Sequence, residues 1–270
     1  MSVKKDASGR RSIQLEVEVP GTPEEVWAAI ATGPGISSWF VPAEFEERDG
    51  KPVAVSVTFG PGMVSRSVVT AWQPLKTFTR EGDGWVPGSP PIATEFSIEA
   101  KAGGTCIVRV VQSLFSSTDD WDGQLTGAEE GWPGIFSILR LYLTHFRGQR
   151  SAFMQFMAPV AGTPADAWAA LTAALGFKGA SVGQRWAVPT GVPALGGVLE
   201  RITHGPYGAL LRLDEPGPGI AALYTIELGD TVMASLAFYM YGDDAARTVD
   251  RERPRWQAWL QESFPLPTGA

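Results

Sequence analysis

The chain has 270 residues, of which 44% are hydrophobic and 19% charged, a composition typical of a globular protein with a sizeable core. Its net charge is −7, and this acidic balance argues against nucleic-acid binding, which depends on a basic surface. A single cysteine excludes an internal disulfide and indicates a cytoplasmic protein, and no apolar run is long enough to cross a membrane.

An internal repeat organises the chain. The segment 21–30, GTPEEVWAAI, returns as GTPADAWAAL at 162–171, and each copy follows a run with strand character. A repeat with so long a period predicts two related domains, each opening as strand, tight turn and helix. Both copies place a threonine before proline, where it can cap the helix, and an acid three residues later that favours the positive helix end. These capping residues are Thr22, Glu25, Thr163 and Asp166.

Further along, Gly33–Phe40 reads GPGISSWF, two strands end in AWQP at 71–74, a hairpin spans 94–115, and Gly131-Trp132 opens a long apolar helix. Together these segments resemble the START-like (SRPBCC, Bet v 1-like) superfamily, in the branch of the heat-shock-protein-90 ATPase activator homologues. The resemblance covers 12–150 well, but only the opening and the Trp-rich last helix of the second half. It implies an α+β helix-grip fold: a curved antiparallel sheet wrapped around a long C-terminal helix, in two tandem copies.

The expected organisation is a disordered tail at 1–11, a START-like domain at 12–150 and a diverged second START-like domain at 151–270. The polar stretch 116–130 is expected to be a loop, and Pro133 is expected to start or kink the late helix. The second half has no counterpart of 36–40, so a smaller cavity or none is expected there. Its strands are expected to turn at Gly205-Pro206 and Gly229-Asp230, before a final helix near 244–264. The strands are expected near 13–19, 43–48, 52–59, 63–72, 76–81, 93–100, 105–115, 152–159, 184–188, 196–204, 207–213, 220–227 and 231–240.

Candidates for chemistry are few. The two histidines, His145 and His204, pair with no nucleophile by sequence, and two histidines with one cysteine make a zinc site improbable. The acidic run 119–122 lacks the pattern of a calcium loop, and the Gly-Pro-Gly turns lack the amides of a phosphate cradle. We therefore expect no catalytic residue, no metal and no cofactor.

The strand at 105–115 is apolar on both faces, with one polar interruption on each, Arg109 and Gln112. A polar group in an apolar site needs a partner. That partner is either a ligand carboxylate or an acid across the hairpin, Glu95 or Glu99, and the acid is favoured. The aromatic residues of the first domain either line a ligand cavity beside this strand or simply fill the core. The expected ligand-binding residues are Trp39, Phe40, Trp72, Phe96, Arg109, Gln112, Trp121, Trp132, Phe136, Leu139 and Tyr142.

The first hypothesis for function is a bacterial binding protein, without enzymatic activity, whose first domain encloses a small hydrophobic or aromatic molecule. An alternative implied by the superfamily is a cyclase- or aromatase-like enzyme acting on a polyketide-like substrate, with Arg109, Gln112, Tyr142 and His145 as candidates. A third is a chaperone-associated or stress-response interaction protein, for which the sequence identifies no protein partner.

Overall fold

The computed structural model describes residues 3–60, 62–83, 88, 90–116, 118–177, 179–204, 207–229 and 231–265, and the side chain of His204 is not among its described parts. It divides into two compact units, Met1–Gly148 (unit 1) and Gln149–Ala270 (unit 2). Among the expected turn residues, Gly205, Pro206 and Asp230 lie outside the described residues.

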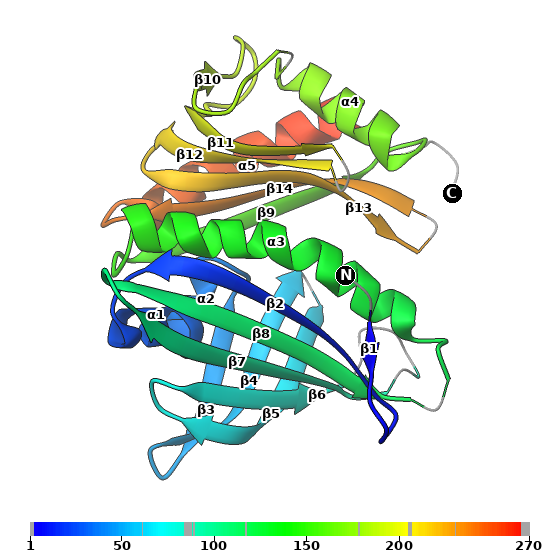
Figure 1. Cartoon of the computed structure of the whole chain (residues 1–270). Helices are drawn as coiled ribbons and strands as arrows, with labels where there is room; N and C mark the ends of the chain where they lie inside the picture. The colour runs from blue at the N-terminus through cyan, green and yellow to red at the C-terminus, as the bar shows by residue number, and fades with distance from the viewer. Residues whose placement is uncertain are drawn as a thin grey trace. The chain divides into compact units, whose positions relative to one another are not determined.

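Unit 1 contains a curved eight-stranded antiparallel sheet with the strand order β1-β2-β8-β7-β6-β5-β4-β3 (Figure 1). Its strands are β1 (Lys4–Lys5), β2 (Arg10–Pro20), β3 (Ala43–Arg48), β4 (Lys51–Gly60), β5 (Met63–Gln73), β6 (Thr77–Gly82), β7 (Ile92–Lys101) and β8 (Thr105–Phe115). Its helices are α1 (Pro23–Ile30), α2 (Gly33–Ser37) and α3 (Asp122–His145), and α3 runs alongside β2 (Figure 1). The expectation of a disordered tail is wrong for part of 1–11, because Lys4 and Lys5 pair with Ser12 and Arg11.

The first two turns of α3 correct another expectation, since the helix begins at Asp122 and continues through Pro133. The sequence there is too polar to predict a buried helix, but one side of it is anchored. Asp122 forms an ion pair with the buried Arg11 of β2, and Leu125 is 0% exposed. Pro133 removes one backbone donor from the helix, which a helix docked on a sheet can tolerate.

Both predicted helix starts are capping boxes. Thr22 Oγ1 accepts from the Glu25 amide at 3.3 Å, while Glu25 accepts from the Thr22 amide at 2.8 Å. Thr163 and Asp166 repeat the arrangement at 3.2 and 2.9 Å. The repeat in the sequence is therefore a repeat in structure, with α1 and α4 (Pro164–Ala174) starting in the same way.

Unit 2 contains a six-stranded antiparallel sheet with the order β10-β11-β12-β13-β14-β9, the helix α4 and the C-terminal helix α5 (Ala245–Ser263). The strands are β9 (Ser151–Pro159), β10 (Arg185–Ala187), β11 (Gly196–His204), β12 (Tyr207–Glu215), β13 (Gly219–Leu228) and β14 (Thr231–Tyr241). Its core joins both helices to the sheet: Trp168 of α4, Phe238 of β14 and Trp256 of α5 belong to one buried cluster. Each unit is thus α+β with one antiparallel sheet and a C-terminal helix, which confirms the expected fold class.

Candidate functional site

An aromatic wall lies on the inner face of the unit 1 sheet, the face that meets α3. The rings of Phe78 and Phe96 stack across β6 and β7 with centroids 5.2 Å apart. Trp132 of α3 meets Phe96 edge-on at 5.7 Å and packs against Phe136 at 5.1 Å. Phe40, which follows α2, stacks on Trp132 at 6.1 Å. Residues from a helix, two strands and a loop therefore form one continuous aromatic surface.

A row of polar side chains crosses this wall. Gln112 of β8 pairs in register with Thr94 of β7, and Thr94 pairs with Arg80 of β6. Gln112 and Thr94 are each only 4% exposed. Gln112 accepts a hydrogen bond from Trp132 Nε1 at 2.8 Å and donates one to Thr94 Oγ1 at 3.4 Å. The polar row is thus tied to α3 through Trp132.

Arg80 is the charged member of the row. Side chains alternate between the faces of a strand, so Arg80 shares the inner face with Phe78, which is 0% exposed. Burial lowers the pKa of Arg80 to about 10, so the guanidinium stays protonated at neutral pH. Among the residues that the structure describes, none forms a hydrogen bond or an ion pair with this side chain. The side chain keeps part of its surface accessible, but it lies deep enough to be desolvated. A partly desolvated cation without a counterion is costly and is typical of a functional site.

The same row in unit 2 is apolar. The repeat aligns Ile13 of β2 with Met154 of β9. The strand order then makes β8, β7 and β6 of unit 1 equivalent to β14, β13 and β12 of unit 2. From Ile13 the partners are Gln112, Thr94 and Arg80. From Met154 they are Phe238, Ala221 and Leu211, all fully buried. The scaffold therefore packs with an apolar row, and the polar row is a property of unit 1 alone.

The structure brings several of the sequence-predicted residues together: Phe40, Phe96, Gln112, Trp132 and Phe136. Two other predicted aromatics also contact the wall, Trp39 through Phe40 at 6.0 Å and Trp72 through Phe78 at 5.6 Å. The first, Trp39, is buried and donates from Nε1 to the Ala29 carbonyl at 2.9 Å. The second, Trp72, is half-buried and meets Trp27 at 5.1 Å.

Arg109 is not part of this group. It lies on the outer face of β8 and forms an ion pair with Glu16 of β2 at 2.6 Å. Its partner is thus neither a ligand nor the acids expected across the hairpin, because β2 is the other neighbour of β8 and places Glu16 directly opposite. Arg80 was missed, although its alternation with Phe78 in β6 places it on the apolar face.

The remaining predicted residues lie along α3. Trp121 is its half-buried N-cap residue, and Leu139 is fully buried. Tyr142 is buried, and its hydroxyl accepts from the Gly148 amide at 3.3 Å. His145, a candidate for the enzyme alternative, is exposed in the last turn. The four residues of that alternative are therefore not gathered in one place.

Other chemistry is limited in the described parts of the chain. No three His, Cys, Asp or Glu side chains there form a group that could hold a metal ion. The thiol of Cys106 is buried against the Gly21 carbonyl, and desolvation raises its pKa, which is typical of an unreactive cysteine. None of the described helices combines the length and the apolar composition of a membrane-spanning segment.

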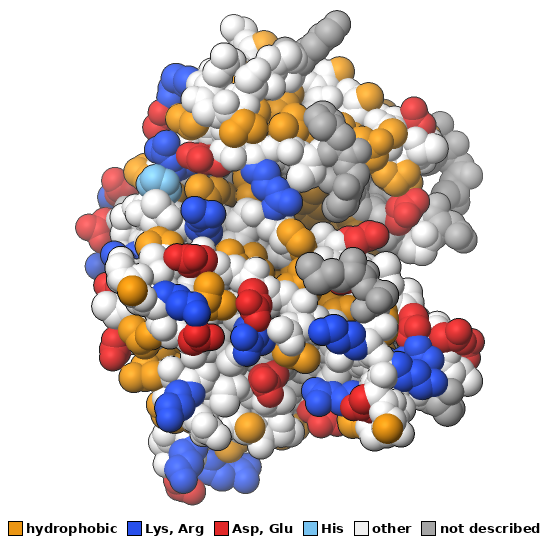
Figure 2. All heavy atoms as spheres, viewed as in Figure 1, with side chains coloured by type: hydrophobic (Ala, Val, Ile, Leu, Met, Phe, Trp, Pro, Cys, Tyr) orange, Lys and Arg blue, Asp and Glu red, His pale blue; other side chains and the backbone are white. Residues whose placement is uncertain are grey.

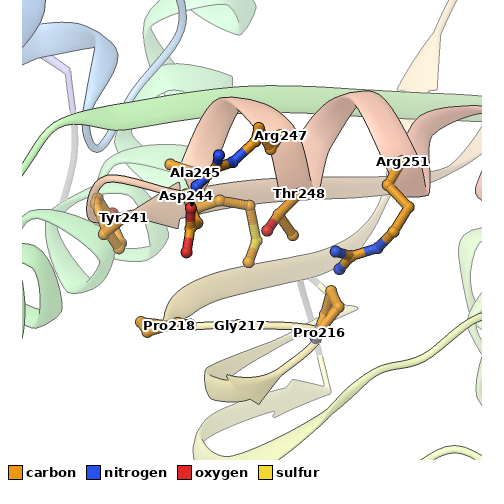
Figure 3. A pocket seen from close by; sticks show the side chains of 10 residues that line it. Pro216, Gly217, Pro218, Tyr241, Asp244, Ala245, Arg247, Thr248 and Arg251 are labelled. Atoms are coloured by element: carbon orange, nitrogen blue, oxygen red, sulfur yellow. Dashed lines mark hydrogen bonds and ion pairs between the residues drawn. The ribbon is translucent and has the colours of Figure 1, made fainter.

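A recess of about 390 Å³ lies in unit 2, between the first turns of α5 and the segment 216–218 (Figure 3). Arg247 and Arg251 both line it, and Arg251 extends toward the recess (Figure 3). Each arginine already has an acidic partner: Arg247 pairs with Asp244, and Arg251 pairs with Glu252 at 2.7 Å. These cations are therefore compensated, in contrast to Arg80.

Charges are mixed on the surface. On the face drawn in Figure 2, basic and acidic side chains lie interspersed among neutral ones. That face carries no broad basic area of the kind that binds a nucleic-acid backbone.

Comparison with known proteins finds likeness at the level of solved structures. No protein-family model and no curated protein matches the sequence. The crystal structure of the di-domain ARO/CYC BexL from the BE-7585A biosynthetic pathway is similar over 95% of this chain and 99% of its own, at 12% identity and a TM-score of 0.45. DynU16, from the dynemicin biosynthetic locus, is similar over 94% of this chain and 95% of its own, at 16% identity and a TM-score of 0.41.

A further similarity covers a single unit. The Aha1 dimer from Colwellia psychrerythraea is similar over 49% of this chain and 95% of its own, at 19% identity and a TM-score of 0.37. The chain's own architecture agrees with what the sequence resemblance implies: each of its two tandem units has an antiparallel sheet and a long C-terminal helix. At these identities and TM-scores the solved structures carry no conclusion about chemistry, which rests on this chain's own residues.

Proposed function

We propose that unit 1 binds a small apolar or aromatic molecule between the inner face of its sheet and α3. The observation that supports this is the polar row beside the aromatic wall: Arg80, Thr94 and Gln112 lie in register across three strands, and Gln112 is hydrogen-bonded to Trp132. A mostly apolar lining with a few placed polar groups is the usual composition of a small-molecule site. Unit 2, which carries an apolar row at the same place, then has a structural role.

In this proposal the apolar lining supplies most of the affinity for the ligand, and the polar row of Arg80, Thr94 and Gln112 orients the ligand in the site. Each square ångström of apolar area removed from water contributes roughly 25 cal/mol before the costs of binding. Trp132 is central, because it contacts three rings of the wall and also holds Gln112 in place. The chain's own contribution is binding and positioning, and the proposal includes no reaction step.

A fluorescence titration with N-phenyl-1-naphthylamine, a neutral aromatic probe, tests the proposal. We expect saturable binding of one probe per chain. Trp132→Ala should weaken it about tenfold or more, since losing the indole removes buried apolar contact worth on the order of 1.5–3 kcal/mol. The matched control is Trp186→Ala, which removes a half-buried indole from β10 of unit 2 and should leave the affinity unchanged.

Native mass spectrometry of the freshly purified protein, followed by solvent extraction, is the complementary measurement. A defined extra mass released as a small apolar compound would support the proposal and identify the ligand. Absence of saturable probe binding, or equal affinities for the wild type and a folded Trp132→Ala variant, would contradict it. Circular dichroism establishes folding, and Gln112→Leu provides a second variant of the same contact.

A further inference from the structure

The inner face of the unit 1 sheet carries a positive charge, on the partly exposed Arg80, that the described residues leave uncompensated. Arg80 is surrounded by inner-face side chains, with Phe78 two residues before it on the same strand and Thr94 opposite. Two arginines on neighbouring strands have acidic partners: Arg66 of β5 pairs with Glu46 at 2.7 Å, and Arg109 of β8 pairs with Glu16. Arg80 shares the inner face with buried side chains and has no such partner among the described residues.

Hydrogen-bond donors beside Arg80 remain available. Thr94 Oγ1 accepts from Gln112, and in the described part of the chain its own hydroxyl proton is not donated to any group. A guanidinium presents a planar fork of donors that fits carboxylate and sulfonate oxygens. Arg80 and Thr94 together therefore offer a positive charge and hydrogen-bond donors to an anionic group.

The fold itself does not demand this charge. At the equivalent position unit 2 carries Leu211, with Ala221 and Phe238 as its row neighbours. All three are fully buried, so an aliphatic side chain packs well at this point of the scaffold. An arginine there adds a cost that unit 2 avoids, and a ligand that pairs with it would offset that cost.

We propose that the ligand of unit 1 is an organic acid, whose anionic group pairs with Arg80 and Thr94 while its apolar or aromatic body contacts Phe96 and Trp132. This inference rests on the proposed function and adds to it the charge of the ligand. The protein recognises the anionic group of this ligand by electrostatic interaction and the body of the ligand by apolar contact. Neutral analogues with the same body bind the same site, but more weakly.

Two probes with the same ring system test the charge separately from the body. 1-Anilinonaphthalene-8-sulfonate carries a sulfonate, and N-phenyl-1-naphthylamine carries none. We expect the wild type to bind the sulfonate probe at least about tenfold more tightly, since a charge-assisted hydrogen bond contributes roughly that factor or more. Arg80→Leu, which installs the residue of unit 2, should abolish the difference by weakening only the sulfonate probe. Arg80→Lys should restore part of it, because the charge is kept and the fork is lost.

Arg66→Leu is the matched control, since it makes the same change of net charge on exposed β5 and should leave both affinities unchanged. Equal losses of both probes in a folded Arg80→Leu variant would overturn the inference and assign Arg80 a packing role. Unchanged binding of the sulfonate probe in that variant would overturn it as well, while leaving the proposed function in place. Failure of the wild type to bind the neutral probe would instead count against the proposed function itself.

Discussion

At the scale of a residue, Arg80 is expected to lower the stability of the folded chain while serving the proposed binding site. Its guanidinium is partly desolvated and has no counterion among the described residues, so the folded state bears a cost that full exposure to solvent would remove. A residue kept only for packing would not need a charge there, as Leu211 of unit 2 illustrates. Groups that destabilise a fold while serving a site are a recognised pattern.

We therefore expect Arg80→Leu to stabilise the protein at neutral pH, by about 1–3 kcal/mol. The reason is that leucine removes the buried charge and keeps an apolar contact with the inner face. The measurement is the urea midpoint of the variant against the wild type. A lower midpoint for Arg80→Leu would show that the arginine stem or an unseen partner stabilises unit 1, and would contradict this account.

The stabilisation expected for Arg80→Leu should depend on pH, because the pKa of Arg80 differs between the folded and the unfolded chain. The pKa of Arg80 is lowered in the folded state to about 10, well below the ordinary value that an arginine has in the unfolded chain. Between these values the unfolded chain binds more protons than the folded chain, so the wild type gains stability as pH rises through this window. Arg80 therefore lowers the free energy of unfolding by its full amount below about pH 10. Above that pH the difference in stability between Arg80→Leu and the wild type should shrink.

At the scale of an element, α3 owes its first turns to two anchors. The stretch 122–130 contains two glycines and three acidic residues, and it has little apolar periodicity of its own. Most helical stability in proteins comes from packing of one face, and here that face is reduced to Leu125 and the Asp122–Arg11 ion pair.

Leu125→Ala is expected to lower the stability of unit 1 by about 2–5 kcal/mol, because it empties a fully buried site. Thr126→Ala, at the next and exposed position, is the control and should change stability by no more than about 0.5 kcal/mol. Both are measured by urea denaturation. Equal, small effects of the two changes would mean that the first turns of α3 are not docked.

The sequence predicts the regular parts of these elements and misses the parts decided by tertiary contacts. Both capping boxes follow from short motifs, since the Thr-to-acid spacing alone produces the hydrogen bonds. The start of α3 does not, because Leu125 is a single apolar residue and Asp122 is held by Arg11, which lies in β2, far away in the sequence. The partner of Arg109 was also missed: alternation gives the face of a strand, but only the sheet order tells that β2, carrying Glu16, lies beside β8.

At the scale of the whole molecule, one scaffold is used twice with different interiors. Both units place a tryptophan from the C-terminal helix against the sheet: Trp132 in unit 1 and Trp256 in unit 2. Trp132 Nε1 donates to Gln112, whereas Trp256 packs on Phe238 at 5.0 Å and its Nε1 is buried with no acceptor among the described residues. The polar row of unit 1 thus satisfies a group that the apolar row of unit 2 leaves unpaired.

The same substitution in the two units should therefore have unequal effects. Trp132→Phe breaks a buried hydrogen bond and leaves Gln112 Oε1 without its donor, while Trp256→Phe removes a donor that is already unpaired. Both changes lose similar ring volume, so the cavity terms largely cancel in the comparison. We expect Trp132→Phe to cost more stability by on the order of 2 kcal/mol, the free-energy difference between losing a satisfied group and losing an unsatisfied one. The measurement is the urea midpoint of each variant under the same conditions. A larger loss of stability for Trp256→Phe would mean that the indole of unit 2 has a hydrogen-bond partner in solution. The interiors of the two units would then differ less than their polar and apolar rows indicate.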